Sequence, residues 1–295
     1  MVANTCFTVQ QLMEKLSKSG RKYDLEKIKL SGEYAESLHE GQFRVSGEPY
    51  ISHPVAVAEI VADLGLDTNS ICAALLHDTV EDCSDKTNLT EIRRLFGDEV
   101  ALLVDGLTKI SGGIFGDKAS AQAENFKKLL LTMSDDIRVI LIKICDRLHN
   151  MRTLGSQAVN KRYKIAGETL YIYAPLANRL GLNAIKTELE DLSFKYEHPE
   201  EYAVIQEKLK LTEEARNSVF DEFTAPIRKK LDEMGLRYEI KARVKSPYSI
   251  WNKMQNKHIP FEIKRIFWTY RVKEGQTRGN HAHRTCSMVL FPVGG

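Results

Sequence analysis

Apolar and polar residues follow one another along most of this chain with the three- and four-residue spacing of amphipathic helices. Segments 8–18 and 24–39 already carry this pattern near the N-terminus. The same spacing predicts further helices at 55–64, 88–96, 99–107, 121–133, 134–154, 167–180, 183–196, 199–210 and 212–234. The body of the chain is therefore expected to be mainly α.

The pattern changes after Gly235. Residues 236–244 alternate as a β-strand does, and 246–257 then reads as a short helix. A domain boundary is therefore expected near residues 200–215, ahead of this change.

One helix has no polar face. Residues 71–76 are all small or apolar, so a helix there would be buried on every side. The run leads into His77, Asp78, Glu81 and Asp82. If the helix continues, His77 and Glu81 share one side and Asp82 lies above Asp78. Three candidate N-caps precede it: Asp67, Thr68 and Asn69.

Ionisable groups at the end of a buried helix are costly unless something compensates them. A divalent cation would do so, with His77 and Asp78 as ligands. The alternative is a helix C-terminus that frays into a polar loop.

A second carboxylate is expected to be buried within segment 134–154. Asp146 points away from the main apolar stripe of this helix, toward a side that is also apolar before it. A carboxylate there needs a cation, which Arg147, a helix cap elsewhere or a metal could supply. The stripe consists of Ile137, Ile140, Leu141, Ile144, Leu148 and Met151.

Two loops flank these helices. Residues 41–54 contain two glycines and two prolines, and Pro54 suits the first turn of the next helix, leaving His53 at its mouth. A lone histidine there is usually a cap. Residues 109–119, with three glycines, are expected to form a mobile loop near the binding site.

Composition places the chain among ordinary globular proteins, with 43% hydrophobic and 28% charged residues. No apolar run is long enough to cross a membrane, no signal-peptide core is present, and the five cysteines lack CxxC spacing. We expect a cytoplasmic protein with reduced cysteines. The sequence contains no GxGxxG and no P-loop.

The net charge of +2 hides an asymmetry. Residues 225–295 hold 15 Lys and Arg against 5 Asp and Glu, a balance of +10, and the preceding residues hold 27 against 35, a balance of −8. A basic C-terminal third could meet phosphates, although a solvated charged face is the commoner explanation.

The candidate residues lie within four motifs that resemble the hydrolase domain of long RelA/SpoT homologues, which make and degrade (p)ppGpp. These motifs are SGEPYISHP (46–54), LHDTVED (76–82), DRLHNMRT (146–153) and YAPLANRLG (173–181). The resemblance covers roughly residues 25–260. It implies an all-helical HD-superfamily phosphohydrolase domain followed by a fragment of an α/β synthetase domain.

The resemblance also implies a site. One Mn²⁺ would be bound by His53, His77, Asp78 and Asp146, beside the catalytic acidic pair Glu81 and Asp82. The nucleotide-contacting positions would be Arg44, Ser46, Tyr50, Asn150 and Thr153. His149 is expected to pack or orient structure rather than bind metal.

The residues alone agree with that chemistry. Two nitrogens and two carboxylates leave coordination positions open for water and a phosphate oxygen. The cation lowers the pKa of that water, which Glu81 or Asp82 can position or deprotonate. One departure is Val45, where the family commonly has a second basic residue after Arg44; this weakens one side of the nucleotide pocket.

The resemblance predicts three regions: a hydrolase domain at 1–200, a helical connector and truncated synthetase start at 201–262, and an unrelated tail at 263–295. Arg243 and Lys245 match synthetase positions that hold ATP phosphates, but the rest of that domain is absent. The tail resembles a cupin-type sugar-nucleotide ketoisomerase and is too short to close a barrel. Its His281 and His283 are therefore expected to be idle, with metal binding as the alternative. Residues 261–267 alternate imperfectly, which allows a strand there to add to the one at 236–244, and most of the tail is expected to be exposed or disordered.

Two functions remain open. The first is an enzyme, a Mn²⁺-dependent (p)ppGpp 3′-pyrophosphohydrolase without synthetase activity, or an HD phosphohydrolase of another nucleotide. The second is a non-catalytic alarmone-binding fragment. The expected partner is a guanine nucleotide alarmone (ppGpp or pppGpp), with no nucleic acid or membrane, and with the oligomeric state open.

Overall fold

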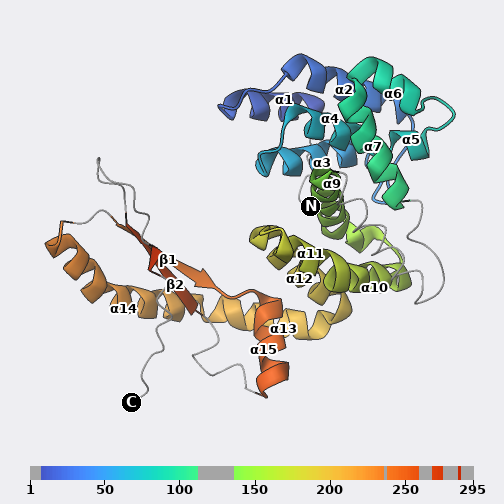
Figure 1. The fold of residues 1–295 in the computed structure, drawn as a ribbon. Helices are drawn as coiled ribbons and strands as arrows, with labels where there is room; N and C mark the ends of the chain where they lie inside the picture. Colours follow the sequence, from blue (N-terminus) through green and yellow to red (C-terminus); the bar gives the residue numbers. More distant parts are fainter. Residues whose placement is uncertain (1–7, 112–135, 236–237, 259–267, 275–284, 287–295) are drawn as a thin grey trace. The chain divides into compact units, whose positions relative to one another are not determined.

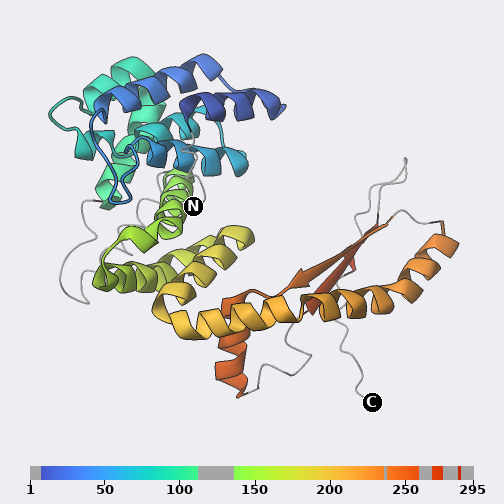
Figure 2. The same ribbon diagram turned by 180° about the vertical axis from the view of Figure 1, so that it is seen from behind.

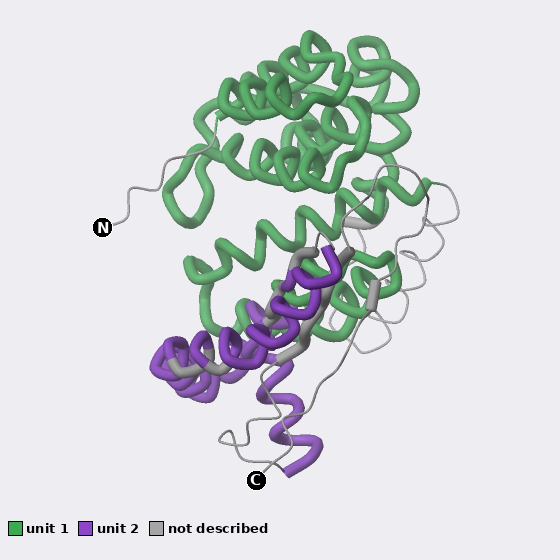
Figure 3. The backbone as a smooth tube through the Cα atoms, turned by 90° about the vertical axis from the view of Figure 1, so that its left-hand side faces the viewer, with its two compact units in different colours: residues 1–189 green, residues 190–295 purple. Residues whose placement is uncertain are grey.

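A computed structural model describes residues 8–111, 136–235, 238–258, 268–274 and 285–286. The chain divides into two compact units, Met1–Leu189 and Glu190–Gly295 (Figure 3). Among the described residues, no helix is both long and apolar enough to cross a bilayer.

The described part of the first unit is helical (Figure 1). Its first seven helices are α1 (Val9–Lys18), α2 (Leu25–Leu38), α3 (Ser52–Asp63), α4 (Thr68–Leu76), α5 (Thr79–Asp82), α6 (Leu89–Phe96) and α7 (Asp98–Ser111). They are followed by α9 (Ile137–Arg152), a 3-10 turn (Leu154–Ser156), α10 (Val159–Glu168), a π-helical turn (Thr169–Tyr173), α11 (Ala174–Arg179) and the first half of α12 (Asn183–Glu197). The mainly α fold predicted from the sequence is confirmed.

Helix α4 forms the centre of this unit. All of its side chains from Ile71 to Leu76 are fully buried, as the absence of a polar face predicted. It packs against α2, α3, α7 and α9, and Figures 1 and 2 show it among the first three. Asp67, one of the three candidates, caps it by accepting the backbone N–H of Ser70.

The expected continuation of α4 through the acidic cluster is wrong, because the helix ends at Leu76. Side chains satisfy its last carbonyl groups: His77 Nδ1 lies 2.8 Å from the carbonyl oxygen of Ala74, and the Thr79 hydroxyl donates to that of Leu76 at 2.7 Å. His77 and Asp78 therefore form a turn, and the short helix α5 starts after it.

Helix α9 is buried on both faces, as predicted. Ile140 and Ile144 of the main stripe are fully buried, and so is Ile142 on the second face. Asp136 caps this helix by accepting the backbone N–H of Arg138. The sequence placed the helix start at 134, which lies outside the described residues.

Two other boundaries differ from the sequence predictions. Helix α3 starts at Ser52, so His53 lies inside its first turn rather than before it. The segment predicted as one helix at 167–180 is the end of α10, a π-helical turn and α11. The predictions for 121–133 and for most of 109–119 lie outside the described residues.

The second unit contains the remainder of α12, α13 (Pro199–Leu211), α14 (Glu213–Glu233), α15 (Pro247–Lys257) and an antiparallel sheet in the order β1-β2-β3. Its hydrophobic core cluster consists of Phe194, Ile205, Leu209 and Ile250. Strand β1 (Tyr238–Val244) pairs along its whole length with β2 (Trp268–Glu274), and β3 (Thr285–Cys286) follows. Part of the tail, Trp268–Glu274, thus pairs with β1, an arrangement that the sequence allowed. His281 and His283 lie outside the described residues.

Candidate metal centre

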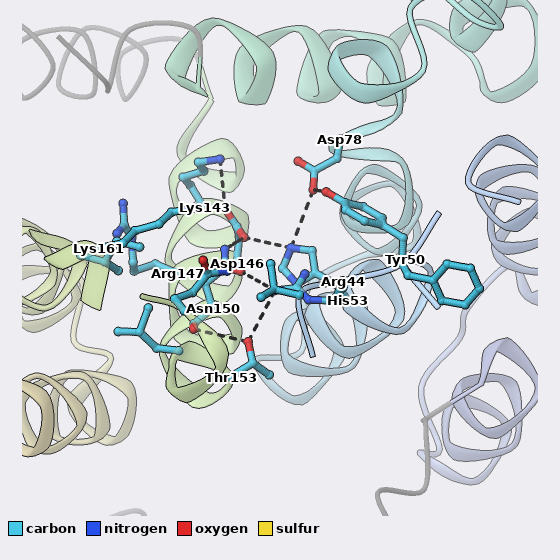
Figure 4. A pocket seen from close by; sticks show the side chains of 15 residues that line it. Arg44, Tyr50, His53, Asp78, Lys143, Asp146, Arg147, Asn150, Thr153 and Lys161 are labelled. Atoms are coloured by element: carbon cyan, nitrogen blue, oxygen red, sulfur yellow. Dashed lines mark hydrogen bonds and ion pairs between the residues drawn. The ribbon is translucent and has the colours of Figure 1, made fainter. Parts of the chain in front are cut away.

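Four side chains from three parts of the first unit converge on one point. His53 comes from α3, His77 and Asp78 from the turn after α4, and Asp146 from α9. His53 Nε2 lies 3.2 Å from Asp146 Oδ1 and 3.8 Å from Asp78 Oδ2. His77 Nε2 lies 2.9 Å from Asp78 Oδ2 and 3.9 Å from Asp146 Oδ1. Figure 4 shows His53, Asp78 and Asp146 facing one another.

These distances fit a shared cation. Nitrogen and oxygen atoms bound at about 2.0–2.2 Å to one ion lie roughly 3–4 Å from each other. Potential ligand atoms of His53, His77 and Asp146 all lie within 4.8 Å of one another, and all three residues are buried. Two imidazoles with carboxylates suit a divalent transition metal.

The orientation of His77 supports the same conclusion. Its Nδ1 faces the carbonyl oxygen of Ala74, so Nδ1 carries the proton and donates it. Its Nε2 is buried 2.9 Å from Asp78 Oδ2, without the alignment of a hydrogen bond. A buried ring nitrogen that lacks an aligned hydrogen bond and lies beside two carboxylates is a position that a cation would satisfy.

Asp146 stays ionised despite its burial. Burial favours the neutral acid, but Lys143 and the two histidines hold the pKa of this carboxyl well below its usual range. Lys143 Nζ lies 3.0 Å from Oδ2, and Asn150 Nδ2 donates to Oδ1 at 2.6 Å. The sequence suggested Arg147, a helix cap elsewhere or a metal as the compensating group, and Lys143 was not among them. The signal was present, since residues three apart on a helix share a side.

The pKa values of the three histidines near this carboxylate are also shifted. Burial opposes the charged form of His77, yet Asp78 raises the pKa of this histidine to about 9. Burial lowers the pKa of His53, and it lowers the pKa of His149 to about 3. In the absence of a cation, His77 is therefore the histidine of this cluster that most readily takes up a second ring proton.

Tyr50 joins the cluster to the acidic turn. Its hydroxyl oxygen lies 2.9 Å from Asp78 Oδ2 and 2.7 Å from Asp82 Oδ2. Asp82 is thus beside Asp78, as four-residue spacing predicted. Burial and the two carboxylates raise the pKa of Tyr50 far above its usual range, so it remains a donor. Glu81 lies on the same turn with an exposed side chain.

A cavity of about 420 Å³ opens beside the cluster. Its lining combines cationic, apolar and amide or hydroxyl side chains. Besides Tyr50, His53, Asp78 and Asp146, the lining residues are Phe43, Arg44, Val45, Lys143, Arg147, Asn150, Thr153, Leu154, Gln157, Lys161 and Ile165. Ser46 is exposed and is not among them.

Two arginines have defined positions in this wall. Arg44 Nη2 donates to Asn150 Oδ1 at 3.0 Å and lies 3.5 Å from Thr153 Oγ1. Arg147 is held by Glu168 at 3.4 Å and lies over the Tyr173 ring at 4.2 Å. Figure 4 shows Arg44, Asn150 and Thr153 close together at the cavity. The site therefore pairs a cation-binding cluster with a partly cationic pocket, which suits a phosphorylated ligand.

Comparison with known proteins supports this organisation. A model of the HD domain matches residues 31–183. A model described as WxcM-like, C-terminal, and named FdtA, matches residues 241–295. The resemblance of the tail to an unrelated family is confirmed, although the match starts before residue 263.

Relatives match most of this chain. A GTP pyrophosphokinase of Myxococcus xanthus is 49% identical over 245 residues, covering 81% of this chain and 32% of the relative. The bifunctional (p)ppGpp synthase/hydrolase SpoT of Escherichia coli is 48% identical over 238 residues, covering 81% and 34%. A guanosine-3′,5′-bis(diphosphate) 3′-pyrophosphohydrolase of Vibrio cholerae is 46% identical over 248 residues, covering 84% and 35%. The chain thus spans about a third of these relatives.

A solved structure of a metazoan orthologue of SpoT, described as hydrolysing ppGpp, is also similar. It is 24% identical, with a TM-score of 0.47, and the match covers 60% of this chain and 99% of that one.

Proposed function

Because the chain belongs to the HD-domain family, with residues 31–183 matching that family's model, we propose that it is a metal-dependent ppGpp 3′-pyrophosphohydrolase. The observation that carries the proposal is the buried set His53, His77 and Asp146, with Asp78 beside it, at the edge of a cavity with cationic side chains. Relatives at 46–48% identity are named for this hydrolysis. The products would be GDP or GTP and pyrophosphate.

His53, His77, Asp78 and Asp146 would hold the cation, which we propose to be Mn²⁺. When bound, a cation of this kind supplies a water of lowered pKa and offsets phosphate charge. The orientation of the ligands comes from the chain itself: His77 is fixed by the carbonyl of Ala74, and Asp146 by Lys143 and Asn150.

Asp82 and Glu81 are the proposed acid–base pair. Tyr50 donates its single proton toward the Asp78–Asp82 carboxylates, so Asp82 is held in place at the mouth of the cluster. A carboxylate in that position can accept a proton from the attacking water. Glu81, exposed on the same turn, can exchange that proton with solvent.

The nucleotide would occupy the cavity. Arg44 with Asn150 and Thr153 presents a donor group for a phosphate or base edge, and Arg147 and Lys161 add positive charge. Val45 leaves an apolar contact where the family commonly has a cation. Ser46, from the same loop, would contact the nucleotide only at the outer edge, because it does not line the cavity.

We also propose that the chain lacks (p)ppGpp synthesis and acts in the cytoplasm. Arg243 and Lys245 can attract phosphates, but residues 246–295 contain no neighbouring pair of acidic residues to hold Mg²⁺, and phosphoryl transfer depends on that charge neutralisation. The proposed organisation is a hydrolase at 1–200, a connector with a truncated synthetase start at 201–262, and the tail.

The proposal is tested by incubating the purified chain and Mn²⁺ with ppGpp labelled in its 3′-pyrophosphate group. The label should leave as pyrophosphate, with GDP as the second product. Release of orthophosphate would assign a different reaction. Unchanged ppGpp that nevertheless binds the chain would support the non-catalytic alarmone-binding module.

A further inference from the structure

His149 lies on α9, three residues beyond Asp146, and its side chain contacts His53 of α3. The two Nδ1 atoms are 2.7 Å apart, and the ring centroids are 4.9 Å apart with the planes tilted by 38°. Two nitrogens this close require one proton between them, because two lone pairs would repel and two N–H groups would clash.

The direction of this hydrogen bond follows from the other side of the His53 ring. His53 Nε2 faces the carboxylates of Asp78 and Asp146, where a cation would be bound. An imidazole that binds a cation through Nε2 keeps its single proton on Nδ1. His53 Nδ1 must then donate, and His149 Nδ1 must accept through its lone pair.

His77 also requires an acceptor for its Nδ1 proton, but that acceptor is a backbone carbonyl rather than a side chain. Its Nδ1 faces the carbonyl of Ala74 in the preceding helix α4, 2.8 Å away. His53 lies in the first turn of α3, where the Tyr50 carbonyl accepts the backbone N–H of His53 itself at 3.0 Å. Its side-chain acceptor comes instead from α9, which also supplies Asp146.

We infer that His149 is a positioning residue that accepts the Nδ1 proton of His53 and so keeps His53 Nε2 turned toward the cation. The inference rests on the proposed metal-dependent function and adds a residue to it. Acceptors of this kind typically change metal affinity about 10- to 100-fold when removed.

Asparagine and leucine form a matched pair for the test. In His149→Asn, the side-chain amide oxygen would occupy the place of Nδ1 and could accept the same proton, whereas leucine has the same shape without an acceptor. We expect His149→Leu to weaken Mn²⁺ binding about 10- to 100-fold, as measured from the signal of free Mn²⁺ in electron paramagnetic resonance. His149→Asn should bind Mn²⁺ with nearly the affinity of the wild type.

A second measurement does not depend on the variants' folding. Nitrogen NMR of the wild type loaded with diamagnetic Zn²⁺ should show a proton on His53 Nδ1 with a scalar coupling across the hydrogen bond to His149 Nδ1. A proton resident on His149 Nδ1, or the absence of that coupling, would overturn the inference. So would Mn²⁺ affinity in His149→Leu that equals the wild type.

Neither readout involves ppGpp, so the two proposals can fail separately. If Mn²⁺ binding depends on the hydrogen bond between His53 and His149 but ppGpp stays intact, the inference about His149 stands and the proposed hydrolase activity is wrong. If the wild type hydrolyses ppGpp and the His149→Leu variant binds Mn²⁺ with normal affinity, the proposed hydrolase activity stands and the inference about His149 is wrong.

Discussion

Lys143 Nζ lies 3.0 Å from Asp146 Oδ2, one helical turn away on α9, and both side chains are buried. The pair sits beside Asp78, whose charge also raises the pKa of Lys143 although burial opposes it. The buried ammonium group of Lys143 thus balances part of the charge of Asp146 and Asp78 before any metal is bound.

Replacing Lys143 with methionine should therefore make the fold depend on metal. Without the ammonium, Asp146 keeps its charge in the interior, which destabilises the metal-free protein by about 3–5 kcal/mol. Added Mn²⁺ should restore part of that loss. Thermal unfolding with and without Mn²⁺ measures both effects.

Lys18→Met is the matched control, because Lys18 pairs with Glu14 on an exposed surface. It should leave the unfolding temperature nearly unchanged, with or without metal, because solvent screens an exposed pair. A Lys143→Met protein as stable as this control would show that Asp146 does not need the ammonium.

Asp146→Asn and Glu81→Gln should separate metal binding from proton transfer. Asp146 faces the histidines, so its amide variant should lose metal, whereas Glu81→Gln should keep metal and lose about 100- to 10,000-fold in kcat. Metal content measured after gel filtration distinguishes them. Equal metal loss in both variants would make Glu81 a ligand.

Tyr50→Phe removes only the hydroxyl that lies against Asp78 and Asp82. If that hydroxyl positions the carboxylates, kcat should fall about 10- to 100-fold while KM changes little. Tyr171→Phe, at an exposed tyrosine, is the control and should behave as wild type. A raised KM with unchanged kcat would instead make Tyr50 a nucleotide contact.

Acid should weaken the start of α9. The side-chain bond to Arg138 lowers the pKa of Asp136, so this pair stabilises the fold above the carboxyl's unfolded value of 3.8 and loses its effect as the pH falls below it. Asp136→Asn keeps the cap and removes the charge. In urea unfolding it should cost up to about 1 kcal/mol at neutral pH and almost nothing once the pH is well below the unfolded value. A difference that persists in acid would exclude the charge as its cause.

The helical spacing of the sequence predicted most helices, the burial of α4 and both faces of α9, because each depends on local periodicity. It did not predict the break after Leu76. That break depends on His77 and Thr79 bonding to the carbonyls of α4, a competition that periodicity does not record.

The candidate site was predicted through its motifs, and the structure brings His53, His77, Asp78 and Asp146 together. Lys143 and the contact between His149 and His53 were missed. The spacing of Lys143 from Asp146 was visible in the sequence, whereas the contact between His149 and His53 becomes clear only once α3 and α9 are packed.

The pairing of the tail with β1 could be predicted only in part, for a similar reason. Strand β2 pairs with all seven residues of β1, and strand pairing between segments separated by a helix is a tertiary contact. The alternation within β1 predicted a strand there, and the imperfect alternation at 261–267 allowed a strand of the tail to add to it, but neither pattern fixes the register.

The most direct test of metal-dependent hydrolysis is a titration of Mn²⁺ into chelator-treated protein, with bound metal and pyrophosphate release from ppGpp measured in the same samples. The account predicts no release from the metal-free chain and a rate that rises in proportion to bound Mn²⁺, up to one ion per chain. Saturated metal binding with no release of pyrophosphate would contradict it.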